Sequence, residues 1–234
     1  MTKTPTSAIV TRAALLIGLA LAAPRAASAQ AVVGAANVST NMGNLNATAV
    51  IGNVINQTGL SAGYTSGVTN FATYTGANPT HDSSSTANIW LSANGTTTGN
   101  VDFNLGGTFT IDRFALWNLG ADTGFNLVGF NLVASPDSSF TTTTSLGSFT
   151  AGTSGTQILS PLQVFTFTAT ATQFVRMQIT SNNGGSFTGF GEAVFRGTAV
   201  SAVPEPSTLA LGSVLAAAGL GSVAVRRRRA RRAA

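Results

Sequence analysis

Side chains that could do chemistry are scarce in the central part of this chain, and their types limit the reactions it could catalyse. There is no cysteine, and His81 is the only histidine, so thiol catalysis and histidine ligand clusters are excluded. Any histidine-based triad would have to use this one residue, which stands in a Ser/Asn/Thr loop. Glycoside hydrolysis by a pair of carboxylates remains an alternative, although the acids stand mostly at strand edges or turn-like positions. The acids between residues 31 and 202 are Asp82, Asp102, Asp112, Asp122, Asp137 and Glu192. We therefore predict that the protein is not an enzyme.

Apolar and polar residues alternate along this region, which is typical of strands with one buried face. Strands are expected at 101–105 and 109–116. A turn is expected between them at Gly106-Gly107, and a bulge near Asp112-Arg113, where the apolar pattern changes phase. Further strand patterns cover 125–134, 162–168, 174–180 and 192–196. Many short strands joined by polar turns predict an all-β fold, an antiparallel β-sandwich of the jelly-roll type.

Four stretches follow one another in an informative order: "VDFNLGGTFTIDRFALWN", "FNLVGFNLVASPDSSF", "ATQFVRMQITSNNGG" and "GFGEAVFRG". From about Thr86 to Gly197, the chain resembles the discoidin or coagulation factor type C family. The resemblance implies a galactose-binding-like sandwich of eight strands, with carbohydrate binding as its function. The disulfide that is usual in this family is absent, because the chain has no cysteine.

A sugar site combines an aromatic platform with amide and hydroxyl groups in loops. Tyr64 and Tyr74 lie in loop segments rich in Gly, Thr and Asn, and His81 could donate a hydrogen bond to a sugar hydroxyl. Trp90 and Trp117 stand in strand motifs and are expected in the core. The predicted ligand-binding residues are therefore Tyr64, Tyr74 and His81, with a merely solvated loop histidine as the alternative for His81.

The same resemblance implies a structural calcium ion between the loop before the Trp-bearing motif and the strand that ends the domain. Asp82, eight residues before Trp90, and Glu192, in "GFGEAVF", fall at roughly those places. Two carboxylates with backbone carbonyls would suffice for such a site, and a carboxylate in an apolar strand needs a partner. The alternative for Glu192 is a surface acid, or one paired with Arg176 or Arg196.

The distribution of charge excludes nucleic acid as a partner. The formal net charge is +5, but the positive residues gather at the two ends of the chain. Between residues 31 and 202, three arginines oppose six carboxylates, which leaves a net charge of −3. Neutralising phosphates needs a basic face that this region lacks.

Residues 1–29 have the features of a signal peptide. Lys3 and Arg12 precede an apolar run over 13–23, and Ala27-Ser28-Ala29 has the small residues that signal peptidase recognises, so cleavage is expected after Ala29. The apolar run is shorter than the roughly 20 residues that a membrane-spanning helix needs. A buried N-terminal helix is the alternative.

The C-terminal end predicts a membrane anchor. Residues 207–225 contain no charge and are long enough to cross a thin bilayer as a helix. The tail 226–234 carries six arginines, which the positive-inside rule places in the cytoplasm, with the domain on the other side of the membrane.

The segment before this anchor, 201–206, contains Val203, Pro204, Glu205 and Pro206. These residues, the apolar helix and the arginine cluster together resemble the PEP-CTERM sorting signal of Gram-negative bacteria. The resemblance implies processing by an exosortase near the Pro-Glu-Pro, in organisms that make exopolysaccharide and biofilm. An ordinary single-span anchor is the alternative.

These features predict one discoidin-like domain over 30–200. We expect an exported protein that is anchored transiently in the inner membrane and then resides on the cell surface or in the extracellular matrix. Its expected function is non-catalytic glycan binding or adhesion, with extracellular polysaccharide as partner. The alternatives are a structural matrix or surface protein without a sugar site and, further off, a polysaccharide hydrolase.

Overall fold

A computed structural model describes residues 30–120, 124–153 and 159–200. The predicted signal peptide (1–29), sorting motif (201–206), membrane-spanning segment (207–225) and basic tail (226–234) lie outside these ranges. Among the described residues, no helix has the length and apolar character needed to cross a bilayer.

The described chain is built mainly from antiparallel strands. The short α-helix α1 is capped by Asn70, whose side chain accepts a hydrogen bond from the backbone N–H of Thr73 at 2.9 Å. The elements, in chain order, are β1 (Ala31–Val33), β2 (Asn37–Thr40), the 3-10 helix η1 (Ile51–Ile55), α1 (Phe71–Gly76), β3 (His81–Asp82), β4 (Trp90–Leu91), β5 (Gly99–Trp117), β6 (Leu127–Ser135), β7 (Thr144–Thr150), β8 (Leu159–Ser160), β9 (Leu162–Asn182), β10 (Gly189–Phe190) and β11 (Glu192–Ala199).

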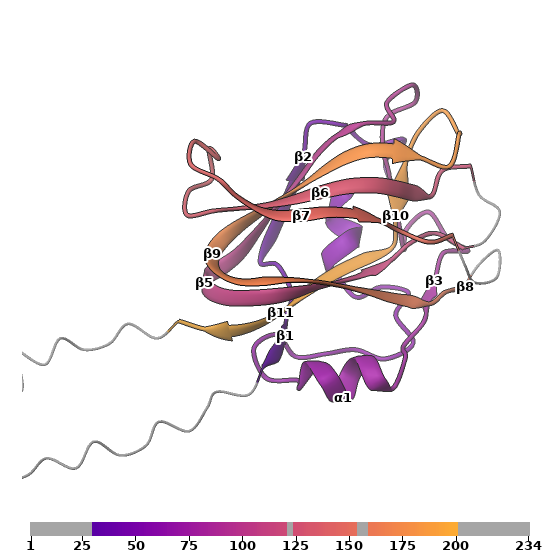
Figure 1. Cartoon of the computed structure of the whole chain (residues 1–234). Helices are drawn as coiled ribbons and strands as arrows, with labels where there is room; N and C mark the ends of the chain where they lie inside the picture. The colour runs from indigo at the N-terminus through magenta and orange to yellow at the C-terminus, as the bar shows by residue number, and fades with distance from the viewer. Residues whose placement is uncertain (1–29, 121–123, 154–158, 201–234) are drawn as a thin grey trace, which may run out of the picture.

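One seven-stranded sheet folds over on itself to make two layers (Figure 1). Its strand order is β1-β11-β5-β9-β6-β7, and β2 also pairs with β5. The first half of β5 and the second half of β9 lie with β2, β6 and β7 in one layer, here the β7 layer. Their other halves lie with β1 and β11 in the β11 layer. The predicted all-β antiparallel sandwich is therefore confirmed.

The long strands β5 and β9 differ from the expected short ones. The predicted turn at Gly106-Gly107 is wrong, since β5 continues through it and only bends, with Gly106 at φ +78° and a break in register between Asn104 and Phe109. The predicted strands 162–168 and 174–180 are likewise one strand, β9. The expected bulge near Asp112-Arg113 is confirmed by a register shift between Ile111 and Arg113.

The main core lies between the two layers and is rich in phenylalanine. Phe114 is at its centre, in ring contact with Phe103, Phe130, Phe165 and Phe195 at centroid distances of 5.2–6.4 Å. All of these except the partly exposed Phe165 are buried, so this cluster is the main hydrophobic contribution to the fold.

A second layer of apolar side chains covers the outer face of the β11 layer. Residues 57–82, here the outer cover, include α1, which lies beyond β1 and β11 in Figure 1. Phe71 and Tyr74 of α1 pack on Trp117 and Val194, whose side chains alternate with the residues that face the main core. The cover therefore buries the outer face of β11, including the side chain of Glu192.

Candidate functional site

Glu192 is fully buried beneath the outer cover and is held by two protein donors. The backbone N–H of Gln57 donates to Oε2 at 3.0 Å, and the Tyr64 hydroxyl donates to Oε1 at 3.2 Å. Gln57 has a left-handed backbone (φ +64°), and its side chain accepts from the backbone N–H of Tyr64 at 2.8 Å. Burial raises the pKa of Glu192 to about 8, although both hydrogen bonds oppose the shift. The neutral acid is therefore the dominant form of Glu192 up to that pH.

His81 is also fully buried, which contradicts its expected role as a donor to a sugar. Its Nε2 lies 3.1 Å from the carbonyl oxygen of Thr58. A Cβ added at Gly191 would lie 2.5 Å from Nδ1, and one added at Gly59 would lie 3.0 Å from Nε2. Burial lowers the pKa of His81 to about 4, so the ring is neutral at physiological pH.

The two predicted tyrosines belong to the cover and do not form an exposed platform. Tyr74 is 6% exposed and donates to the carbonyl of Ala62 at 2.7 Å, so its predicted contact with a sugar is wrong. Tyr64 is half-buried, packs edge-on against Tyr74 at 5.8 Å, and uses its hydroxyl for Glu192. Trp90 and Trp117 are fully buried, as expected for core residues.

The residues predicted to hold calcium do not fit the ion as they stand. Both Glu192 oxygens accept hydrogen bonds from the protein, and burial favours the protonated acid, whereas calcium needs ionised oxygens. Asp82 accepts from the backbone N–H of Ser84 at 2.8 Å. The described residues include no group of three or more His, Asp or Glu side chains that could hold a metal. Calcium stays a prediction that would require the donors on Glu192 to move away.

Melting curves test the calcium prediction directly. A bound ion would raise the melting temperature in millimolar calcium at pH 7 and lower it in excess chelator, and Glu192→Gln would remove both effects, because the amide cannot supply an ionised oxygen. Magnesium serves as the control for general salt effects. Identical melting curves with calcium and with chelator would rule the ion out.

The arginines proposed as alternative partners of Glu192 pair elsewhere. Arg176 binds Asp102 with two hydrogen bonds of 2.7 and 2.8 Å, and Arg196 binds Asp112 with Nε at 2.7 Å from Oδ1. In the described part of the chain, no ion pair involves Glu192.

A surface hollow lies on the outer face of the β7 layer, and its cavity volume is about 180 Å³. Strand register explains the set of side chains along it. Ser39, Asp102 and Arg176 stand side by side on β2, β5 and β9. Two residues further along, Asn37, Asn104 and Phe174 form a parallel row on the same face. The sheet thus presents hydroxyl, amide and carboxylate groups next to an aromatic ring.

Phe140 forms one wall of this hollow, which we call the groove. Its position is defined by a side-chain contact and by its backbone conformation. The Arg176 guanidinium lies 4.1 Å from the centre of the Phe140 ring, within the range of a cation–π contact. Phe140 also has a left-handed backbone (φ +53°), which is strained for a bulky side chain. A structure keeps such strain only where its surroundings enforce it, and strain of this kind is concentrated at binding sites.

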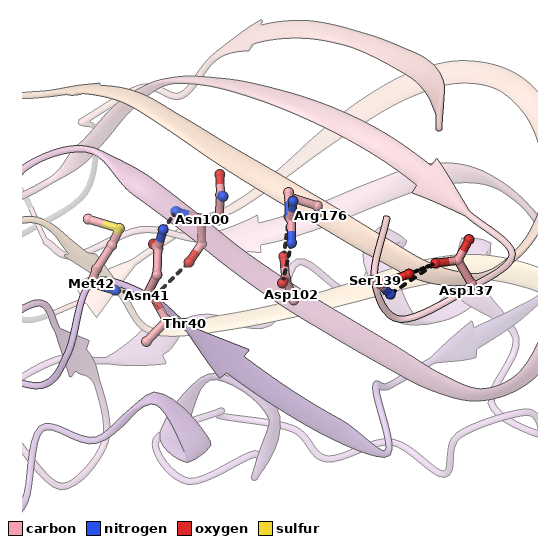
Figure 2. Close-up of polar contacts among 8 residues, drawn as sticks. All are labelled: Thr40, Asn41, Met42, Asn100, Asp102, Asp137, Ser139 and Arg176. Atoms are coloured by element: carbon pink, nitrogen blue, oxygen red, sulfur yellow. Dashed lines mark hydrogen bonds and ion pairs between the residues drawn. The ribbon is translucent and has the colours of Figure 1, made fainter. Parts of the chain in front are cut away.

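The loop that carries Phe140 is organised by Asp137 (Figure 2). The Asp137 carboxylate accepts from the backbone N–H of Ser139 at 3.0 Å and from the Thr141 hydroxyl at 3.1 Å. Hydrogen bonds from Ser139 and Thr141 lower the pKa of Asp137 to about 2, so it stays ionised at physiological pH. The Asp137 carboxylate can therefore accept these hydrogen bonds throughout the physiological pH range.

The opposite wall of the groove is fixed by the joint between β2 and β5. Figure 2 shows the Thr40 hydroxyl donating to the carbonyl of Asn100 at 2.7 Å, while Asn41 accepts from the backbone N–H of Asn100 at 2.8 Å. The same Thr40 hydroxyl accepts from the backbone N–H of Met42 at 3.1 Å. These bonds hold β2 in register with β5 and so place its side chains beside Asp102.

Sequence reasoning missed the groove. The polar alternation of 101–105 and 174–180 was visible, but strand partners were not, so nothing indicated that Asp102 and Arg176 stand opposite each other. The left-handed Phe140 lies in the polar stretch "SPDSSF" and gives no sequence signal of its conformation.

No protein family model matches the chain, and no curated protein matches it. Several solved structures are similar in outline. A chitosan-binding module of a chitosanase/glucanase from Paenibacillus sp. IK-5 is 18% identical, with 72% of this chain and 99% of that chain covered and a TM-score of 0.48. A putative chitobiase fragment from Bacteroides thetaiotaomicron is 15% identical, with 73% and 91% covered and a TM-score of 0.49. The CBM32 domain of AlyQ, in complex with 4,5-unsaturated mannuronic acid, is 16% identical, with 70% and 96% covered and a TM-score of 0.44.

Proposed function

We propose that this chain is a non-catalytic carbohydrate-binding protein that holds a sugar in the groove on the outer face of the β7 layer. The observation that carries the proposal is the position of Phe140. This aromatic residue has a strained backbone, contacts Arg176 and lines the groove beside a row of hydrogen-bonding side chains. An enzyme needs a reacting group placed beside the ligand, whereas the groove offers a carboxylate that is already bound to Arg176.

The chemistry of the groove suits a sugar ring. The apolar face of a pyranose can lie on Phe140 or Phe174, while its hydroxyls meet Asn37, Ser39 and Asn104. The hollow is smaller than the roughly 300–1,000 Å³ of drug-sized ligand pockets, so it holds one sugar unit at a time. It is also open enough to lie on the sheet surface, as binding to one unit of a longer chain requires.

The charges of the groove and of the whole domain limit the class of sugar that the groove can bind. Of the described residues that line the groove, Asp102 alone is a carboxylate and it is neutralised by Arg176, while the other polar residues are uncharged. With a net charge of −3 over residues 31–202, the domain repels polyanions weakly. We therefore propose uncharged sugars as ligands, in preference to uronic acids.

The export route belongs to the same proposal and rests on the sequence. Signal peptidase would remove residues 1–29, and an exosortase would act near Val203–Pro206 after the segment 207–225 had held the chain in the inner membrane. The galactose-binding-like fold and a place in an exopolysaccharide or biofilm matrix at the cell surface are parts of this proposal too. Mass spectrometry of the native product tests processing, and a product that retains both chain ends would refute it.

Replacing Phe140 is the direct test of the groove. In a glycan array followed by titration of the best ligand, Phe140→Ala in the full chain is expected to weaken binding about fivefold, because a stacked aromatic contact is worth on the order of 1 kcal/mol. Phe140→Tyr should retain binding, because it keeps the ring.

The controls separate this groove from the site expected from the sequence. Val68→Ala changes an exposed residue of another segment and should leave binding unchanged. If Tyr64→Ala removes binding while Phe140→Ala does not, the groove is not the site. If no glycan binds the native chain, the proposal fails in favour of a structural protein without a sugar site.

A further inference from the structure

Among the residues that the structure describes, one side of the sandwich ends in two strand edges without a partner strand. β7 is the last strand of its layer, and the 162–171 half of β9 ends the β11 layer, since it pairs with β5 and, within the described ranges, with no strand on its other side. The two edges are neighbours, because the Phe149 ring of β7 lies 5.5 Å from the Phe165 ring of β9. We call residues 144–150 and 162–171 the open side.

The open side carries no charge. No Asp, Glu, Lys, Arg or His occurs from Ser138 to Val175, a stretch that includes both edge strands. Sheet proteins commonly protect their edges with charged side chains, proline or bulges. Among the described residues, the protection here consists of Gly147 at φ +135° in β7, Pro161 directly before β9, and a break in register between Thr166 and Thr170 in β9. The regular part of the exposed β9 edge is therefore Leu162–Thr166.

The opposite edge of the β11 layer is protected in a different way. The β1 backbone is bonded on its outer side to the chain at 67–69, with the Val32 N–H donating to Thr69 and its carbonyl accepting from Gly67, both at 2.8 Å. The open side has no such cover among the described residues, although it includes exposed apolar surface. Val164 is 39% exposed and the adjacent Leu159 is 41% exposed.

We propose that a second copy of this chain pairs with Leu162–Thr166 as an antiparallel strand, so that two β11 layers join into one continuous sheet. A segment that pairs with itself about a two-fold axis is automatically complementary, and it closes as a dimer. With Val164 at the axis, Val164 meets its own copy, and Leu162 meets Thr166. The partner chain would supply the missing hydrogen bonds to the β9 backbone.

Charge does not oppose this contact. The domain is net negative, but its described charged residues all lie outside the stretch 138–175, so two open sides bring no charged residues of their own against each other when they meet. A short strand-to-strand contact buries less area than a standard protein interface, so the association is weak and depends on concentration.

Sedimentation of the full chain in a mild detergent tests the pairing with a matched pair of substitutions. The native chain is expected to shift from monomer to dimer between about 1 and 300 µM, a range suited to a small interface. Val164→Lys should hold the mass at that of a monomer, because it places two lysines against each other at the axis. Val68→Lys makes the same change at a residue that is 74% exposed on another segment, and it should dimerise like the native chain. Thr166→Lys repeats the test with a second exposed position.

Cross-linking tests the predicted register independently. Because the chain has no cysteine, a single Val164→Cys is expected to form a disulfide-linked dimer on oxidation, whereas Val68→Cys should remain monomeric. A monomer at every concentration would overturn the proposal, as would equal masses for Val164→Lys and Val68→Lys. If the native chain and Val164→Lys are both monomers and Val164→Lys has lost glycan binding, the open side would be assigned to a sugar. That result would also overturn the dimer proposal.

Discussion

Glu192→Gln is expected to abolish a loss of stability that the native protein shows between pH 6.5 and 8. Burial raises the pKa of Glu192 from its ordinary 4.5 to about 8, so between these values the folded state holds a proton that the unfolded state has released. Stability therefore falls as pH rises through this window. The slope is about 1.4 kcal/mol per pH unit for one proton, which makes about 2 kcal/mol from pH 6.5 to 8.

His81 has the opposite effect in the acid part of this range. Burial lowers its pKa from 6.5 to about 4, so between these values the unfolded state binds a proton that the folded state does not, and stability rises with pH. The effects of Glu192 and His81 on stability cancel between pH 4.5 and 6.5. Above pH 6.5 only the effect of Glu192 remains, so stability falls as pH rises. Tyr64 and Tyr74, the other titratable groups near Glu192, have pKa values raised by burial, that of Tyr74 to about 12, so both stay neutral over this range.

Denaturant titrations at half-unit intervals from pH 4.5 to 9 would measure these slopes. Glu192→Gln should leave stability nearly flat above pH 6.5 and rising with pH below it. The matched variant His81→Gln should instead show stability falling continuously from pH 4.5 to 8. A native profile that is flat between pH 6.5 and 8 would show that Glu192 is not buried as a neutral acid.

Gly189→Ala is expected to cost about 3 kcal/mol of stability, at the upper end of the range for overpacking a core. A Cβ at this position would lie 2.1 Å from the carbonyl oxygen of Trp90, a backbone atom that cannot rotate away. Gly189 pairs with Leu91 where β10 meets β4, and next to it Phe190 packs edge-on against Trp90 at 5.6 Å. The added methyl group would therefore push β4 and β10 apart.

Gly107→Ala is the matched control, because a Cβ there meets only a ring carbon of Phe109 at an ordinary 3.7 Å. Thermal and denaturant unfolding should show a change near zero for Gly107→Ala and a lower midpoint for Gly189→Ala. Equal midpoints would mean that β4 and β10 are further apart than the structure places them.

Local pattern was sufficient for those features of the fold that depend on one residue and its immediate neighbours. The alternation around Val101 and Phe103 predicted strands, and the change of phase near Asp112 predicted the bulge that the register shift confirms. The placement of Trp90 and Trp117 in the core followed from their strand motifs. The turn predicted at Gly106-Gly107 was wrong, because a glycine with positive φ can form a bend inside a long strand as well as a turn.

The sequence by itself determined that this domain is an all-β protein with almost no catalytic side chains, since alternation and composition are local properties. Which residues lie together was decided by the tertiary structure alone. It buried Tyr74 and His81 within the cover (57–82) and Glu192 beneath it, and it placed Asp102, Arg176 and Phe140 around a surface groove. The physical reason is that strand pairing and the docking of the cover join residues from 74 to 135 positions apart, and no local pattern encodes such distant partners.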